Sequence, residues 1–355
     1  MNTFGNYVRL TTFGESHGLG IGGVLDGIPS GLAIDLSALQ KMMGHRRPGA
    51  SDLTSVRNES DEVTFLSGLT EEYVTTGAPI AYFVENRDVR SSDYDAVRNL
   101  FRPGHADYTY FVKYGHSTAS GGGRSSARET VARCVAGAIA LQWLAQRGIK
   151  IYPYICSVGE LSLPEWTEID PTRAYDFSSR CPNEALDKEI IRLISSIRAE
   201  GDSIGGVVAC KVEGVPAGWG EPIYDKLSAR LGYAMLSING VKGFEFGDGF
   251  RTASMTGSKA NDAMALRKDG SPYFLSNHAG GILGGISTGA PIFFRTAFKP
   301  TPSISKPQQT ISSDGHAATI EIAGRHDPCI AIRAVAVVEA MTALVLADYM
   351  ALSRD

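Results

Sequence analysis

Three stretches of the chain have the spacing of apolar and polar residues that is typical of long helices, at 126–147, 184–200 and 329–350. The first opens with Ser126 and Glu129, which are placed three residues apart as in a capping box. In the second, the preceding asparagine at 183 is the expected N-cap. These signals predict where two of the helices begin.

The most apolar part of the chain, 329–352, is interrupted by Arg333, Glu339 and Asp348. A membrane-spanning helix of this length carries few or no charges. The stretch therefore predicts a buried core helix, and we expect no membrane partner. The N-terminal segment MNTFGNYVRLTTFGESHG also lacks the apolar core of a signal peptide.

Apolar runs bounded by glycine, proline and polar residues predict strands between the helices. These runs lie at 8–13, 78–84, 205–215, 290–298 and 318–323. The chain is thus expected to mix helices with strands.

Parts of the sequence are similar to each other in the same order. The segment 21–32 resembles 204–219, and 76–83 resembles 288–295. Each pair is followed by an Ala/Val-rich helical stretch with an arginine, Arg133 in one and Arg333 in the other. The order suggests a duplication, whereas chance matching of glycine-rich turns is the alternative.

If the duplication is real, residues 1–355 form one domain with pseudo-repeat halves of about 1–150 and 200–355. The weakly patterned piece at about 150–200 would then connect them. A site would naturally lie between the halves.

The composition is that of an ordinary globular protein, with 43% hydrophobic and 20% charged residues. The net charge of -4 offers no basic field for nucleic acid, so no such partner is expected. The five cysteines form no Cys-x-x-Cys pair and indicate neither a zinc site nor a disulfide framework, which fits a cytoplasmic location. Arginine outnumbers lysine by 23 to 11, which could reflect codon bias or sites for phosphate and carboxylate groups.

The motif at 14–18, Gly-Glu-Ser-His-Gly, formally matches the G-x-S-x-G of serine hydrolases. That motif needs a strand, a sharp turn and then a helix. Here Leu-Gly-Ile-Gly-Gly follows, and so many glycines do not begin a helix. The polar Ser16-His17 tip between glycines instead suits the close approach of a small polar ligand.

Two arginine-rich motifs indicate anion binding. Arg46-Arg47-Pro48-Gly49 is a weak signal alone. The run FRPGHAD at 101–107 and the run GGGRSSAR at 121–128 form a stronger one, because the second leads into a helix. Glycine backbone, serine hydroxyls and the positive end of a helix together favour phosphate. The Gly-Lys-Ser/Thr of a nucleotide P-loop is missing.

A fourth motif, GRHDPC at 324–329, also precedes a long helix. Ordinary capping by Asp327, with proline in the first turn, explains it as well as a functional carboxylate does. His116, His278 and His316 lack metal-ligand spacing, so no metal is expected. The glycine runs also lack the strand–turn–helix setting of a nicotinamide dehydrogenase.

Taken together, these motifs resemble the chorismate synthase family over nearly the whole chain. The resemblance also includes SINGVKGFEFGDGF at 237–250, NHAGGILGGISTG at 277–289 and Lys299-Pro300. It implies a 1,4-anti elimination of phosphate from 5-enolpyruvylshikimate 3-phosphate, giving chorismate with the help of reduced FMN. It further implies an α+β fold, a β-α-β sandwich with internal pseudo-twofold duplication, and a homotetramer.

The resemblance also implies roles for individual residues. His17 matches the histidine that protonates the departing phosphate, His105 one that supplies a proton beside the flavin, and Asp327 the carboxylate that accepts the substrate proton. An ordinary imidazole pKa near ~6.5 would suit both histidines. Matches to substrate-binding positions are Ser16, Arg46, Arg57, Arg102 and Arg128. Matches to flavin-binding positions are Arg124, Ser125, Ser126, Asn239, Gly240, Gly284, Lys299, Pro300, Thr301, Pro302, Ser303 and Arg325.

One position departs from the family pattern. Many relatives have an arginine where this chain has Asp52, and a carboxylate repels the phosphate of a dinucleotide. We therefore expect NAD(P)H to act only indirectly, through an external flavin reductase.

Overall fold

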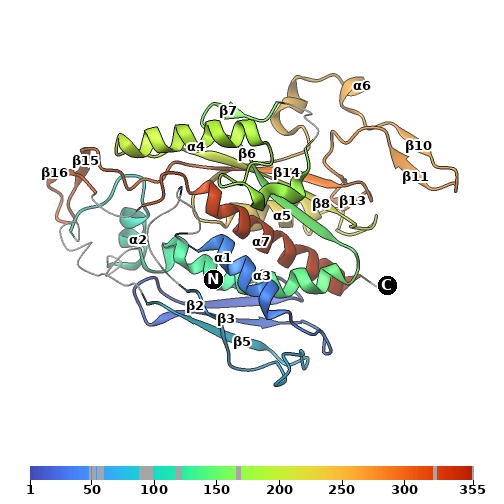
Figure 1. The fold of residues 1–355 in the computed structure, drawn as a ribbon, viewed down its shortest axis with the longest axis horizontal. Coiled ribbons are helices and arrows are strands. Elements are labelled where there is room, and N and C mark those ends of the chain that lie inside the picture. Colours follow the sequence, from blue (N-terminus) through green and yellow to red (C-terminus); the bar gives the residue numbers. More distant parts are fainter. Residues whose placement is uncertain are drawn as a thin grey trace.

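Two five-stranded antiparallel sheets enclose a layer of helices in the computed structural model (Figure 1). The structure describes residues 1–47, 49, 53, 60–87, 99–116, 122–164, 169–322 and 326–353. In spatial order, the first sheet contains β1 (Thr3–Phe4), β2 (Arg9–Gly14), β3 (Gly20–Asp26), β5 (Ile80–Glu85) and β4 (Thr64–Phe65). The second contains β7 (Leu161–Ser162), β6 (Lys150–Val158), β8 (Gly206–Glu213), β14 (Ile292–Phe298) and β9 (Val241–Phe246).

Four helices fill the space between the sheets, and a fifth covers the outer face of the second sheet (Figure 1). The inner four are α1 (Leu36–Arg46), α3 (Thr130–Ala145), α5 (Leu227–Leu236) and α7 (Ala331–Leu352), and the outer one is α4 (Glu184–Ala199). This arrangement confirms the α+β class and the expected β-α-β layers.

Smaller elements lie around the sandwich. They are α2 (Asp107–Tyr114), α6 (Gly257–Ala260) and the hairpins β10 (Met264–Leu266) with β11 (Pro272–Phe274), β12 (Ile282–Leu283) with β13 (Ile286–Ser287), and β15 (Gln308–Ile311) with β16 (Ala317–Ile320). Short 3₁₀ turns occupy Gly123–Ser125, Ala127–Glu129, Pro171–Asp176 and Gly249–Ser254. The β10–β11 and β15–β16 hairpins project from opposite ends of the molecule (Figure 1).

Four strands of each sheet follow the same topology, β2-β3-β5-β4 in the first and β6-β8-β14-β9 in the second, so that α1 corresponds to α5 and α3 to α7. The edge strands differ, because β1 precedes β2 in the chain whereas β7 follows β6. The similar sequence segments fall on corresponding strands, β3 with β8 and β5 with β14. This agreement favours duplication over chance matching.

The second sheet begins earlier than the sequence suggested. We assigned about 150–200 to a connection, but β6 at Lys150–Val158 pairs along its length with β8. Pro153 obscures this strand in the sequence, because proline lacks the N–H that a central strand needs. On the other side of β6, the described chain pairs β7 only with Ser157 and Val158, so no described strand needs an N–H from Pro153.

The sequence signals for helix starts are confirmed for one helix and only partly for another. Asn183 caps α4 as expected, accepting a hydrogen bond from the backbone N–H of Leu186 at 3.0 Å. Ser126 instead caps a 3₁₀ turn, and α3 begins only at Thr130. The capping box does not close because the Glu129 carboxylate binds Arg133 at 2.8 Å.

Helix α7 forms the centre of the core. By length and composition alone it could cross a membrane, but 83% of its apolar window is buried within the structure. It packs closely against α3, since a Cβ added to Gly137 would lie 2.4 Å from both Cα and Cβ of Ala340. The glycine lets the two helices approach each other.

We predict that Gly137→Ala destabilises the protein. Alanine favours a helix by roughly 1 kcal/mol over glycine, but overpacking a core costs about 1–3 kcal/mol and here it affects backbone atoms. The free energy of unfolding in urea should therefore fall. Gly44→Ala in α1 is the matched control, because nothing lies within 4 Å of the added Cβ, and its stability should rise or stay unchanged. Equal gains in both variants would contradict the close packing.

Candidate active site

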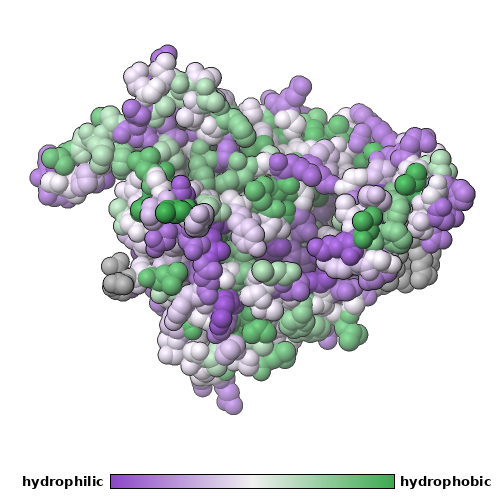
Figure 2. Space-filling model, turned by 180° about the vertical axis from the view of Figure 1, so that it is seen from behind, coloured by the Kyte–Doolittle hydropathy of each residue, from purple (hydrophilic) through white to green (hydrophobic). Residues whose placement is uncertain are grey.

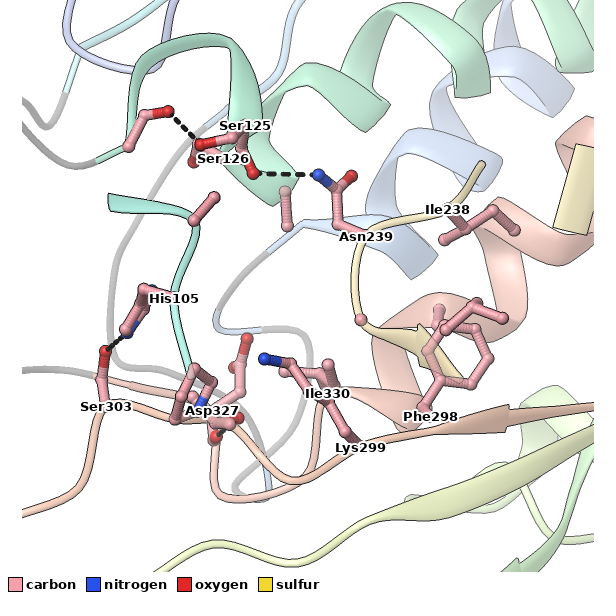
Figure 3. A pocket seen from close by; sticks show the side chains of 18 of the residues that line it. His105, Ser125, Ser126, Ile238, Asn239, Phe298, Lys299, Ser303, Asp327 and Ile330 are labelled. Carbon is pink, nitrogen blue, oxygen red and sulfur yellow. Dashed lines mark hydrogen bonds between the residues drawn. The ribbon is translucent and has the colours of Figure 1, made fainter. Parts of the chain in front are cut away.

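A pocket of about 660 Å³ lies where the two halves meet at the N-terminal ends of α3 and α7. The first half contributes residues of 102–109 and 122–130, and the second contributes residues of 238–242, 298–303 and 326–337. Figure 2 shows one face of the molecule, where hydrophilic side chains border a hollow. Figure 3 shows His105 and Ser303 on one side of the pocket and Ile238 and Asn239 on the other.

Most of the predicted site residues line this pocket. They are Arg46, Arg102, His105, Ser125, Ser126, Arg128, Asn239, Gly240, Lys299, Thr301, Pro302, Ser303 and Asp327. These residues come from segments separated by up to almost 300 residues, and the fold brings them together around one cavity.

The turn before α3 and the turn before β9 bind each other across the pocket. The Asn239 side-chain amide donates a hydrogen bond to the carbonyl oxygen of Ser125 at 2.9 Å. Its own carbonyl oxygen is buried and has no hydrogen-bond partner in the described part of the chain. Gly240 has φ +85°, and an added Cβ would lie 2.6 Å from Ile330. The absence of a side chain at Gly240 thus leaves space in the pocket wall, next to the Asn239 side-chain oxygen that can accept a hydrogen bond.

One part of the pocket wall is apolar. It is formed by Ile238 and Phe298, together with Ile330, Ala334 and Val337 of the α7 region. The polar groups named above therefore face an apolar surface across the same cavity, a combination typical of sites for ring-containing ligands.

His105 is held at the opposite wall. Its Nε2 lies 2.7 Å from the hydroxyl oxygen of Ser303. Burial, followed by the charge of Arg102, lowers the pKa of His105 to about 3. The expectation of an ordinary imidazole pKa is therefore wrong for His105 in the free protein, where the ring is neutral near pH 7.

The arginines of the pocket are paired with aspartates. Arg102 donates from Nε and NH2 to the Asp107 carboxylate, each at 2.7 Å. Arg333 donates from NH1 to Asp327 at 2.5 Å and from Nε to the carbonyl oxygen of Arg46 at 2.9 Å. Two further arginines, at 46 and 128, share the carboxylate of Asp61.

His17 lies on a loop that hydrogen bonds link to Arg128. It is not among the described residues that line the cavity, and its Nδ1 lies 3.0 Å from the hydroxyl oxygen of Ser16. Asn86 connects this loop to the pocket. Its amide donates to the carbonyl oxygens of Glu15 and Gly18 at 2.9 Å, and its oxygen accepts from Arg128 Nε at 2.9 Å.

Three predicted flavin-binding residues do not line the cavity. Arg124 donates to Thr12 Oγ1 at 2.8 Å and thereby fixes the turn before α3 to β2. Gly284 lies in the β12–β13 turn, and Pro300 also lies outside the lining. The predicted Arg57 and Arg325, like Asp52, lie outside the described residues.

The sequence reasoning missed three charged groups, namely Asp61, Asp107 and Arg333. Asp107 and Arg333 line the pocket, and Asp61 lies behind it. In the sequence, Arg333 stands out only as a charge within an apolar stretch and as a mark of the repeat, and Asp107 only as part of a motif. The sequence offered no signal for Asp61, because it lies in a segment without helix or strand pattern.

The sequence model of the chorismate synthase family matches residues 8–351. The chain is 54% identical over 357 residues to the chorismate synthase of Porphyromonas gingivalis, covering 100% of this chain and 97% of the relative. The chain belongs to the chorismate synthase family. The enzyme is accordingly a lyase of the shikimate pathway.

Other relatives of the family agree. The chorismate synthase of Azobacteroides pseudotrichonymphae is 51% identical over 98% of this chain and 99% of the relative. A solved crystal structure of a chorismate synthase has a TM-score of 0.78 and 30% identity, covering 98% of this chain and 92% of that one. The chorismate synthase fold is thereby confirmed.

Family membership also decides against the serine hydrolase. The Ser16-His17 tip lies between β2 and β3, which pair as an antiparallel hairpin. A chorismate synthase does not need the strand–turn–helix elbow that a hydrolase nucleophile requires.

We predict that His105 titrates far below the usual pH in the free protein. Because its folded-state pKa is lowered, the ring stays neutral down to about pH 3 while an unfolded histidine protonates near ~6.5. Stability contributed by the neutral ring is therefore lost as the pH falls from ~6.5 toward 3. NMR of ¹⁵N-labelled imidazoles measures this directly, with His316, whose side chain is 82% exposed, as the internal comparison. Titration of His105 near 6.5 would contradict the buried geometry.

Proposed function

We propose that this pocket converts 5-enolpyruvylshikimate 3-phosphate to chorismate by a 1,4-anti elimination of phosphate, with reduced FMN as the cofactor. The single observation that carries the proposal is the meeting of arginines and flavin-matching segments from both halves in one cavity of about 660 Å³. That volume falls within the range of sites for small molecules.

The described residues fit a flavin. The buried carbonyl oxygen of Asn239 has no partner in the described part of the chain and can accept a hydrogen bond from a ring N–H. The apolar wall of Ile238, Phe298 and Ile330 suits a planar ring. Lys299, which also lines the pocket, offers a positive charge for a phosphate. When bound, reduced FMN would lend an electron or its equivalent and recover it, leaving no net redox change.

The pocket also suits a substrate with one phosphate and two carboxylates. Arg46, Arg128 and Arg333 present positive charge from α1, from the turn before α3 and from α7. The fork of Arg102 is already engaged by Asp107, so Arg102 acts mainly by its charge and by holding its loop. Arginine suits this task because it stays charged when buried and binds oxyanions with fixed geometry.

Three groups handle protons in the proposed reaction. His17, on the loop that Asn86 links to Arg128, protonates the departing phosphate. His105 is neutral in the free enzyme, but the negative charge of bound ligands raises its pKa and allows it to hold a proton in the loaded pocket. Asp327 accepts the substrate proton, and its pairing with Arg333 orients the carboxylate toward the pocket.

The remaining proposals concern partners and location. We propose a cytoplasmic homotetramer that receives reduced flavin from an external reductase. The support is the family resemblance, the absence of Cys-x-x-Cys pairs from the sequence, and Asp52 in place of a possible anion-binding arginine. Sustained chorismate formation in air with NADPH and FMN alone would refute the need for an external reductase.

The function is tested by an anaerobic assay with the substrate and photoreduced FMN. We expect chorismate to form only when reduced FMN is present, while none of the flavin is consumed. Oxidised FMN is the control. Formation of chorismate at full rate without flavin would refute the proposed chemistry.

His17→Ala and His105→Ala should each slow turnover by ~10²–10⁴-fold, the usual contribution of a positioned acid or base. Binding of oxidised FMN, measured by fluorescence quenching, should survive in both variants. His316→Ala is the matched control, because that side chain is exposed and does not line the pocket, and its turnover should be unchanged. Near wild-type rates in the first two variants would make these histidines structural.

A further inference from the structure

Asp61 is a buried carboxylate that binds two arginines at once. Its Oδ2 lies 3.1 Å from Arg46 NH1, and its Oδ1 lies 2.5 Å from Arg128 NH1. The side chain of Asp61 is 0% exposed, and those of Arg46 and Arg128 are 3% and 11% exposed. The two arginines come from different elements, the end of α1 and the turn before α3. One carboxylate thus fixes the distance between them.

The backbone of Asp61 is held in a rare conformation. Its φ is +48°, in the left-handed region that non-glycine residues seldom occupy and that aspartate and asparagine tolerate best. In the described chain only Tyr73 and Arg180 share this feature among residues other than glycine. A conformation of this kind persists where the surrounding structure fixes it, often near functional sites.

Stability alone does not explain this arrangement. Replacing buried ion pairs by apolar residues of similar size is often neutral or stabilising, so a buried pair is weak evidence for a structural role. Here both arginines also line the pocket, whereas Asp61 lies behind them. Arg128 is further oriented by Asn86 Oδ1 at 2.9 Å and by the carbonyl oxygen of Glu85 at 3.2 Å.

The number of arginines bound to one carboxylate distinguishes this group from the other pairs. Among the described residues, the Asp107 carboxylate binds Arg102 and the Asp327 carboxylate binds Arg333. The Asp61 carboxylate binds two arginines, Arg46 and Arg128. Burial acts to raise the pKa of Asp61, but Arg46 and Arg128 outweigh it and hold the pKa below its usual value, so the carboxylate stays ionised at neutral pH.

We propose that Asp61 is a positioning residue that holds Arg46 and Arg128 as a preformed receptor for an anionic group of the substrate. The inference rests on the proposed function only for the identity of that substrate. Asp61 itself does not touch the ligand. Asp61 holds both arginine side chains in place before the anion binds, so binding does not have to include the free-energy cost of ordering them.

The test compares Asp61→Asn with the wild-type enzyme. Asparagine keeps the volume and tolerates the left-handed backbone, but it removes the charge that anchors both guanidinium groups. We expect KM for the substrate to rise about 10- to 100-fold while kcat changes less, the loss associated with a charge-assisted contact. Since the net charge of the group rises by one, KM should also depend more steeply on salt.

Two further variants separate positioning from folding. Asp61→Glu keeps the charge but misplaces it, so KM should rise without a steeper salt dependence. Asp187→Asn is the matched control, because Asp187 is also buried but does not line the pocket. Its carboxylate accepts a hydrogen bond from the backbone N–H of Ser179 at 2.9 Å. Its KM should be unchanged. An unchanged or lower KM in Asp61→Asn, or in Asp61→Glu should Asp61→Asn not fold, would overturn the proposal.

Calorimetric titration with inorganic phosphate measures anion binding without any reaction, so it tests the role of Asp61 independently of the proposed function. The wild-type protein should bind phosphate about tenfold or more tightly than Asp61→Asn. Equal affinities, or no binding by the wild-type protein, would refute the preformed receptor. If phosphate binds as expected but the substrate is not turned over, the proposed function fails and the role of Asp61 remains.

Discussion

The close contact between α3 and α7 is the constraint on which the rest of the structure depends. Gly137 and Ala340 allow these two corresponding helices to touch at backbone distance. The residues at their N-terminal ends line the same pocket, 122–130 for α3 and 326–334 for α7. Exposed N–H groups give helix N-termini a partial positive charge. The pairing of the halves therefore brings two helix N-termini to the same pocket, and their partial positive charge favours an anion there.

Arginine side chains add to this positive charge, and bringing them together costs free energy that nearby aspartates offset. Four arginines in one partly buried pocket would repel one another, and burial disfavours each charge. Asp61, Asp107 and Asp327 bind these arginines and fix the orientation of their guanidinium groups. Burial, followed by the charge of Arg102, lowers the pKa of His105 and keeps its ring neutral near pH 7. The proposed polyanionic substrate would bring negative charge close to His105 and so favour its protonated form.

The features that were predicted correctly from the sequence depend on residues close together in the chain. Asn183 was placed correctly as the cap of α4, because its side chain acts on the next turn of its own helix. Strand β6 was missed because Pro153 breaks the pattern, although the neighbouring edge is open there. The motifs, together with the family resemblance, predicted site residues of which most line the pocket. Their partners could not be predicted, since Asp61 meets Arg46 and Arg128 only after α1 and α3 have packed.

Two corresponding arginines show how a duplicated framework yields one site and not two. Arg133 of α3 donates to the hydroxyl of Ser237, at the end of α5, at 2.8 Å, and Arg333 of α7 donates to the carbonyl of Arg46, at the end of α1, at 2.9 Å. Each helix thus holds the first helix of the opposite half. The remaining contacts differ, because Arg133 pairs with Glu129 of its own helix start, whereas Arg333 pairs with Asp327 in the pocket. The shared contact maintains the junction between the halves, and the contact that differs holds the Asp327 carboxylate, the proposed proton acceptor, at the pocket.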